Sequence, residues 1–181
     1  MVTEIEPGAE IHADHPFATA AGGRGPVRRF RGRLAAPVTL WTAPGGAGGD
    51  PAGLTVSSAL VADGDPGRVF GVIDPESDLY EAIGEARVFT VQALTPSHRQ
   101  LADRFAGVAP APGGLFRTGE RWRDTEWGPV LDEIGAWAGC RFAGARDAGW
   151  GRLVEGVVEH AALGNPTPPL LHHLGRYGEL R

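Results

Sequence analysis

A row of hydroxyl groups follows a glycine in the run GLTVSS at residues 53–58. Apolar side chains alternate there with Thr55 and Ser57, which is the period of a β-strand, so the two hydroxyls lie on one face. Gly53 has no side chain, and a flat group can therefore approach the backbone closely. The pattern fits a strand that bonds the edge of a planar ligand, and it also fits a surface strand whose hydroxyls are solvated.

A second candidate is an anion site at Ser77. This residue precedes an apolar-periodic segment at 78–85 and is a favourable helix N-cap. The free amides and the partial positive charge of a helix N-terminus suit a phosphate. Glu76 and Asp78 would repel a phosphate, and acidic residues also favour the start of their own helix without any ligand. The residues alone leave both interpretations open.

The segment at 95–107 predicts another helix, because the proline near its start and the glycine at its end are typical boundary residues. Phe105 comes four residues after Leu101, so the two share a helix face and core packing explains them. Arg104 either neutralises a bound anion or is a solvent-exposed side chain without a binding role. No general-acid pair and no nucleophilic triad stands at a recognisable spacing, which disfavours a hydrolase.

The composition excludes several kinds of chemistry. All 17 basic residues are arginine, so a Schiff-base or P-loop lysine is excluded. Cys140 is the only cysteine, which excludes an intrachain disulfide, and its place in a predicted strand indicates a buried, inert thiol. His12 and His15 have no obvious third ligand, so no metal site is expected. The net charge of −5 argues against nucleic acid, and the arginines at 28, 29, 31 and 33 fit a solvated helix face or one packed against a partner subunit.

The hydropathy pattern bears on where the protein resides. No apolar run approaches the roughly 18 residues that a membrane helix needs. Residues 1–6 are acidic and lack the apolar core of a secretory signal. We therefore expect a cytoplasmic protein.

Glycine (28) and proline (15) take about twice their usual share, which predicts many turns and short regular elements. We expect an irregular N-terminal arm at 1–26 and one domain at 27–181. In that domain we expect a helix at 27–34, a long excursion at 108–128, an extended tail at 170–180, and strands at 38–42, 53–61, 68–73, 87–94, 134–146 and 152–161. Such strands, joined mostly by turns, predict a mainly β protein with an antiparallel barrel that closes its edges.

Several short pieces of the sequence occur in an order known from one family. They are PVTLWT at 37–42, GLTVSS at 53–58, DPESDLY at 74–80, FTVQAL at 89–94, LADRFAG at 101–107 and LHHLGRYG at 171–178. Together they resemble the flavin reductase-like, FMN-binding split-barrel family over approximately 27–180. The resemblance implies an antiparallel six-stranded split β-barrel of Greek-key type with a few short helices, usually a homodimer with FMN near the subunit interface. It also implies an oxidoreductase that reduces flavin with NADH or NADPH, and some members supply reduced flavin to a partner monooxygenase.

The resemblance assigns roles to single residues. His173 and Tyr177 match the family's His-x-Gly-x-Tyr element near the flavin and the nicotinamide site, and they are the expected catalytic residues. The expected FMN contacts are Thr39, Gly53, Leu54, Thr55, Ser57, Ser58, Ser77, Arg104, Phe105 and Arg176.

One turn departs from the family pattern. Many of the family's reductases carry an Asp-His pair between the last two long strands, whereas residues 147–152 read DAGWGR and place Trp150 and Gly151 there. A tryptophan can cover a ring face and Arg152 can meet a phosphate, but the imidazole is absent. The alternatives are therefore an FMN-binding or carrier protein without NAD(P)H reductase activity, a deazaflavin-linked protein, and a small barrel that binds another flat ligand.

Overall fold

The computed structural model describes residues 25–180. The arm expected at 1–26, with His12 and His15, therefore lies almost wholly outside the described residues. Three short helices are present, α1 (Pro26–Arg33), α2 (Asp78–Ala86) and α3 (Arg99–Phe105), together with the 3-10 turns η2 (Gly46–Gly48), η3 (Pro96–His98) and η4 (Leu115–Arg117). Among the described residues, none of the helices has the length and apolar character to cross a membrane.

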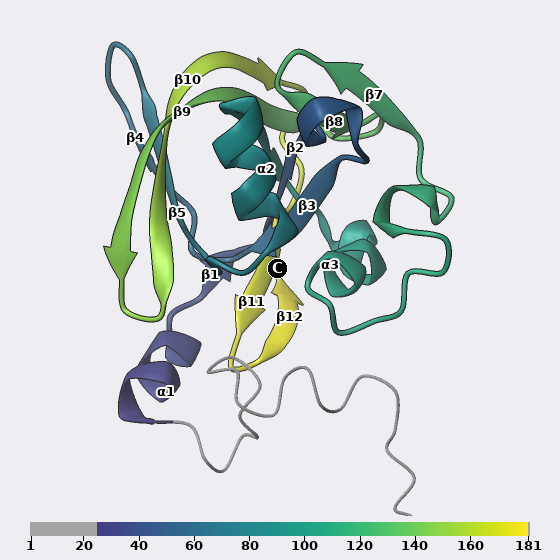
Figure 1. Ribbon diagram of the computed structural model, residues 1–181. Helices are drawn as coiled ribbons and strands as arrows, with labels where there is room; N and C mark the ends of the chain where they lie inside the picture. The colour runs from purple at the N-terminus through teal and green to yellow at the C-terminus, as the bar shows by residue number, and fades with distance from the viewer. Residues whose placement is uncertain (1–24, 181) are drawn as a thin grey trace, which may run out of the picture.

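The main sheet contains β2 (Thr39–Ala43), β3 (Ala52–Val56), β4 (Leu60–Ala62), β5 (Arg68–Ile73), β6 (Val88–Ala93), β9 (Ala136–Ala148) and β10 (Gly151–Leu163). These seven strands are all antiparallel and run in the order β3-β2-β6-β9-β10-β5-β4, with α2 across one face (Figure 1). A mainly β protein with few short helices is thus confirmed. In the described residues the hydrogen-bonded ladder has seven strands and stays open at β3 and β4, where six strands closing on themselves were expected.

The open sheet curls strongly, so that β5 comes to lie over β2. At Gly71 of β5 a Cβ atom would stand 2.7 Å from the indole ring of Trp41. The strand expected at 53–61 is interrupted, with β3 ending at Val56 and β4 starting at Leu60. In this break the Ser58 hydroxyl bonds the backbone of β5 at Val72.

Two smaller sheets complete the fold. One joins β1 (Ala36–Pro37), β11 (Leu170–His173) and β12 (Arg176–Glu179), so that the tail expected to be merely extended forms a hairpin. The other is the hairpin of β7 (Trp122–Thr125) and β8 (Gly128–Leu131), whose strand β7 lies inside the expected excursion at 108–128. A buried amide fixes this hairpin, since Gln92 Nε2 donates to Pro129 O at 3.2 Å and Gln92 Oε1 accepts from Leu131 N at 2.9 Å.

The core has two parts. One lies between α2 and the sheet, where the Trp41 and Phe89 rings stack at 4.9 Å. Cys140 belongs to this part, and burial raises the pKa of its thiol to about 12, which confirms the expected buried thiol. The second part lies under α3, where Phe105 and Leu101 are both buried, as their spacing predicted.

Candidate functional site

Three chain segments meet at one end of the main sheet. Ser58 Oγ donates to Val72 O at 3.0 Å and accepts from Val72 N at 2.9 Å, which ties the exit of β3 to β5. Ile73, the last residue of β5, pairs with Arg152 at the start of β10. The structure therefore brings the hydroxyl-bearing segment, the start of the Ser77 loop and the hairpin turn before Arg152 to the same end of the sheet.

Most hydroxyls that were expected to contact a cofactor are bonded inside the protein. Thr39 Oγ1 donates to Val56 O at 2.7 Å and accepts from the indole N–H of Trp41 at 3.0 Å. Thr55 Oγ1 donates to Ala102 O at 2.7 Å, which links β3 to α3. These two hydroxyls therefore bond within the sheet and between β3 and α3.

Ser77 is the N-cap of α2, as the sequence predicted. Its Oγ accepts from Tyr80 N at 3.3 Å and donates to Asp74 O at 2.7 Å. The hydroxyl thus has a partner in each direction within its own turn. Asp78 and Glu81 lie in the first turn of α2.

Ser57 differs from the other hydroxyl residues because its bond reaches α1. Ser57 Oγ accepts a hydrogen bond from Arg31 Nη2 at 3.3 Å, across 26 residues of sequence. Arg31 was expected on a solvated helix face or on one packed against a partner subunit, and not at a ligand. No local pattern signals a contact between residues so far apart.

Gly53 leaves room for an aromatic ring of the protein itself. A Cβ atom at this position would stand 2.6 Å from Cε1 of Phe105. Phe105 is buried and packs edge-on against Phe116 at 5.1 Å between ring centroids. Leu54, on the other face of β3, is half-buried against the core beneath α2.

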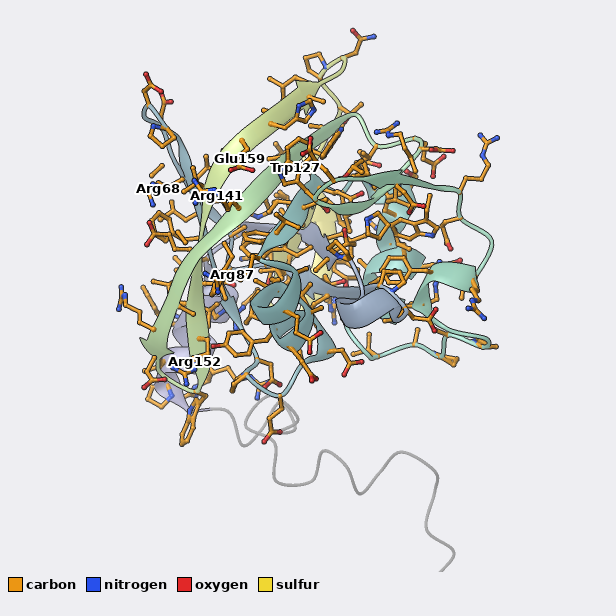
Figure 2. The ribbon with its side chains drawn as sticks, turned by 45° about the horizontal axis from the view of Figure 1, so that its top comes forward. Arg68, Arg87, Trp127, Arg141, Arg152 and Glu159 are labelled. Carbon is orange, nitrogen blue, oxygen red and sulfur yellow. The ribbon has the colours of Figure 1, made fainter. Side chains whose placement is uncertain are left out.

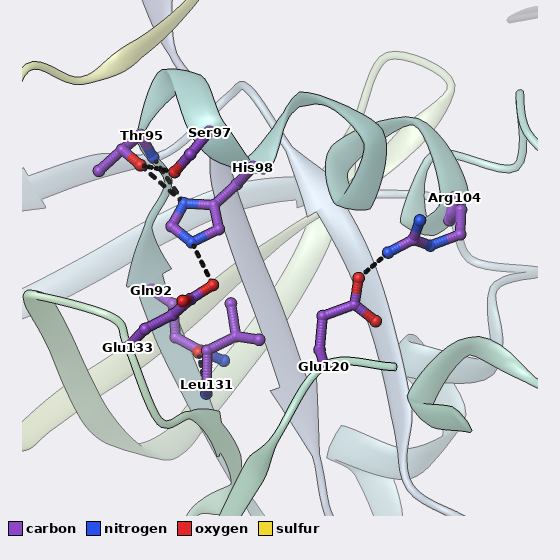
Figure 3. A network of polar contacts seen from close by, with 8 residues as sticks. All are labelled: Gln92, Thr95, Ser97, His98, Arg104, Glu120, Leu131 and Glu133. Carbon is purple, nitrogen blue, oxygen red and sulfur yellow. Dashed lines mark hydrogen bonds and ion pairs between the residues drawn. The ribbon is translucent and has the colours of Figure 1, made fainter. Parts of the chain in front are cut away.

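Arg104 is engaged with a carboxylate, as Figure 3 shows. Its Nη2 donates to Glu120 Oε1, and Thr118 Oγ1 donates to Glu120 Oε2 at 2.7 Å. Burial raises the pKa of Glu120, but hydrogen bonds from Thr118 and its own backbone, together with the charge of Arg104, outweigh that effect and hold the pKa below its ordinary value. The charge of Arg104 is therefore largely neutralised within the protein.

A buried histidine that sequence reasoning overlooked lies in the same region (Figure 3). His98 Nδ1 accepts from Thr95 N at 3.0 Å and lies 2.9 Å from Thr95 Oγ1, while His98 Nε2 lies 3.5 Å from Glu133 Oε1. The spacing Thr-x-x-His resembles a capping box and could have signalled it. The residue stabilises the start of η3, the 3-10 turn that leads into α3.

The C-terminal hairpin carries both expected catalytic residues. His173 pairs with Arg176 across β11 and β12, and Leu174 and Gly175 form the turn. Tyr177 is half-buried, and burial and the nearby carboxylate of Asp103 raise the pKa of its phenol to about 12. An open pocket of about 460 Å³ is lined by His173, Leu174, Arg176, Tyr177 and Gly178. This volume falls in the range of roughly 300–1,000 Å³ that is usual for small-molecule sites.

The hairpin also contacts α1. Leu174 N donates to Gly32 O at 2.7 Å. Because Gly32 follows Arg31 directly, α1 connects Ser57 to the C-terminal pocket. Ser57 at the end of β3, the helix α1 and the C-terminal hairpin thus form one continuous region, which we call the candidate region.

Several other arginines are held by contacts within the protein (Figure 2). Arg141 Nε donates to Glu159 at 2.6 Å, and Glu159 also accepts from the indole N–H of Trp127, which holds its pKa below the ordinary value. Arg87 lies 4.3 Å from the centre of the Phe142 ring. Arg152 pairs with Asp147 at 2.8 Å and braces the turn that carries Trp150, whose side chain is 79% exposed.

The fold places the chain in the class of small, mainly β proteins built on an antiparallel sheet with a few short helices. The family model described as "Flavin reductase like domain" matches residues 31–181. The chain belongs to the flavin reductase-like family.

Characterised relatives are similar over most of the chain. The reductase component of a 4-nitrophenol 4-monooxygenase/4-nitrocatechol 2-monooxygenase from Rhodococcus opacus is 29% identical over 151 residues, which cover 83% of this chain and 78% of that protein. A flavin reductase (NADH) from Kitasatospora aureofaciens is 32% identical over 145 residues, which cover 76% of this chain and 69% of that protein. The crystal structure of a nitrilotriacetate monooxygenase component B homologue from Mycobacterium thermoresistibile superposes with a TM-score of 0.77 at 26% identity, covering 86% of this chain and 85% of that one.

Proposed function

We propose that this chain is an FMN-binding oxidoreductase that passes hydride or electrons from NADH or NADPH through flavin and supplies reduced flavin to a partner monooxygenase. The observation that carries the proposal is the family match over residues 31–181, which includes Arg31, Ser57 and the whole C-terminal hairpin. The names of the Rhodococcus and Kitasatospora relatives support the reductant and the partner. When bound, FMN supplies the ability to accept and return a hydride, and the protein supplies binding and orientation.

The residues of the candidate region fit such a cofactor. A flavin needs an apolar wall, hydrogen-bond donors and a cation for its phosphate. The pocket on the C-terminal hairpin offers Leu174 and the Tyr177 ring as a wall, and the guanidinium of Arg176 supplies N–H donors and a positive charge. His173 lies at the rim of this pocket, where its imidazole can orient a second ligand.

The other expected FMN contacts divide into two groups. Ser57 and Arg176 present polar groups at the candidate region, and we propose them as direct contacts. The remaining residues support the region through internal bonds and packing, and they are Thr39, Gly53, Leu54, Thr55, Ser58, Ser77, Arg104 and Phe105.

We also propose that the curled sheet is the six-stranded split barrel of the family and that the protein is a homodimer. The Ser58 bridge between β3 and β5 supports the first proposal, together with the close approach of Gly71 to Trp41. The apolar stripe of Val27, Phe30 and Leu34 at α1, a helix that has no buried residue, supports the homodimer.

The second candidate function is an FMN carrier without nicotinamide-dependent turnover. It is favoured by the turn at Trp150 and Gly151, which brings no imidazole to the site. The two functions differ in whether a nicotinamide reduces the bound flavin.

Anaerobic titration separates the two functions. FMN is added to the purified protein, and the flavin absorbance is followed while NADH or NADPH is added, with dithionite as the chemical control. We expect a nicotinamide to bleach the flavin at a rate well above that of free FMN. Bleaching by dithionite alone would contradict the reductase and support the carrier.

A further inference from the structure

We propose that Arg31, together with Ser57, binds the phosphate group of the flavin. This inference rests on the proposed function and concerns which residues hold the anionic end of the cofactor. The shared chemistry of the ligand is a phosphate, which FMN and nicotinamide dinucleotides both carry. We take the phosphate to be the monoester of FMN, because Ser57 belongs to the segment that resembles the flavin contacts of the family.

The Ser77 turn is a poor phosphate site in this chain. Its hydroxyl is bonded on both sides, by Asp74 O at 2.7 Å and by Tyr80 N at 3.3 Å. Asp78 and Glu81 follow in the first helical turn, and a dianion placed there would be repelled. The helix N-terminus is already stabilised by these carboxylates.

Arg31 is a guanidinium without a carboxylate partner in residues 25–180, and its one hydrogen bond is to a neutral hydroxyl. Six arginines of the described chain pair with a carboxylate, and Arg31 is among those that do not; the six are Arg68, Arg104, Arg117, Arg121, Arg141 and Arg152. Since Ser57 only accepts in this bond, its O–H remains able to donate. The pair thus offers a positive charge and several N–H and O–H donors, which is what a phosphate requires.

The position of the pair fits a ligand whose ring lies at the C-terminal hairpin. Gly32, the residue after Arg31, accepts the backbone N–H of Leu174 at 2.7 Å. Leu174 and Arg176 line the pocket of about 460 Å³ beside it. The Arg31–Ser57 pair and this pocket therefore lie on two elements that contact each other, α1 and the C-terminal hairpin.

The test compares two flavins that differ only in the phosphate. Dissociation constants for FMN and riboflavin are measured by flavin fluorescence for the wild type, for Arg31→Gln and for the control Arg33→Gln. Arg33 lies on the same helix and has the same charge, but its side chain points away from Arg31 by the helical spacing. Circular dichroism verifies that all three proteins fold alike.

For Arg31→Gln we expect FMN affinity to fall roughly tenfold, the lower end for a charge-assisted hydrogen bond because Arg31 is exposed. Riboflavin affinity should change by less than about twofold, and Arg33→Gln should change neither, since no phosphate contact is lost. Ser57→Ala removes the hydroxyl and leaves the sequence of α1 unchanged. It should also weaken the binding of FMN more than the binding of riboflavin.

Three results would overturn the assignment. The first is an equal loss of affinity for FMN and for riboflavin in Arg31→Gln, and the second is unchanged affinity for both. The third is that Arg31→Gln binds FMN normally but binds NADH or NADPH more weakly, measured by dialysis. That result would mean that Arg31 binds the phosphates of the nicotinamide nucleotide. A wild-type protein that binds neither flavin would refute the proposed function itself, and the assignment of Arg31 with it.

Discussion

Gly53 illustrates how one residue can be required for packing at a position that also suggests a ligand. The absence of a side chain there first suggested a close approach by a flat ring. The ring that makes this approach is Phe105, at 2.6 Å from where a Cβ atom would stand. Phe105 in turn belongs to α3, which accepts the hydroxyl of Thr55. The glycine therefore sets the distance between β3 and α3.

Substituting Gly53→Ala should destabilise the fold by about 1–3 kcal/mol, because the Phe105 ring or β3 must shift to admit the methyl group. Urea unfolding measures the change. Gly84→Ala is the matched control, since Gly84 is exposed in α2 with no atom within 4 Å of its Cβ position, and there we expect a gain of about 0.5–1 kcal/mol. Equal unfolding free energies for the two variants would contradict this role of Gly53.

Among the elements, the 3-10 turn η3, which leads into α3, depends on an unprotonated imidazole. His98 Nδ1 accepts the backbone N–H of Thr95, so the ring proton belongs on Nε2, which faces Glu133. Burial lowers the pKa of His98 below its ordinary value of 6.5, although the charges of Glu133 and Glu120 and a hydrogen bond to Glu133 oppose the shift. Protonation at Nδ1 would remove the acceptor that the Thr95 N–H needs.

The sign of the pH effect follows from this shift. Because the folded pKa of His98 is depressed, the unfolded state binds more protons, and stability falls as the pH drops below 6.5 toward the folded pKa. His98→Gln keeps an acceptor at this capping position without titrating. We therefore expect the variant to lose less unfolding free energy than the wild type between about pH 8 and about pH 5, measured by urea unfolding.

Glu133→Gln is the control for that experiment. Glu133 raises the pKa of His98, so its removal should lower the pKa further and make the loss of stability on acidification larger. Identical pH profiles for the wild type and His98→Gln would show that this imidazole does not titrate on unfolding.

Over the chain as a whole, local patterns predicted many of the elements, missed the hairpin strand β7 and the break after β3, and predicted none of the long-range contacts. The strand at 68–73 was predicted with the bounds that the structure has, and the helix at 78–85 within one residue, because periodicity and an N-cap are local signals. The Gln92 network and the bond from Arg31 to Ser57 join residues 26 or more positions apart. Such contacts decide which hydroxyls remain available for a ligand, and no sequence period encodes them.

The outward face of α1 leads to a prediction about assembly. Val27, Phe30 and Leu34 lie along one side of this region at 80%, 64% and 54% exposure, and α1 has no buried residue. An eight-residue helix is not stable in water by its own hydrogen bonds, so its apolar stripe needs a surface to cover it. A second copy of the chain supplies that surface in the proposed homodimer.

Sedimentation equilibrium should therefore give about twice the chain mass of 19.0 kDa. Phe30→Glu places a charge in the stripe and should shift the protein to the monomer, because an unpaired carboxylate is costly to bury. Leu163→Glu is the control, since Leu163 is 83% exposed at the end of β10, away from α1, and its substitution should leave the dimer intact. A monomeric wild type, or dissociation of the dimer by both substitutions alike, would contradict the prediction that α1 forms the dimer interface.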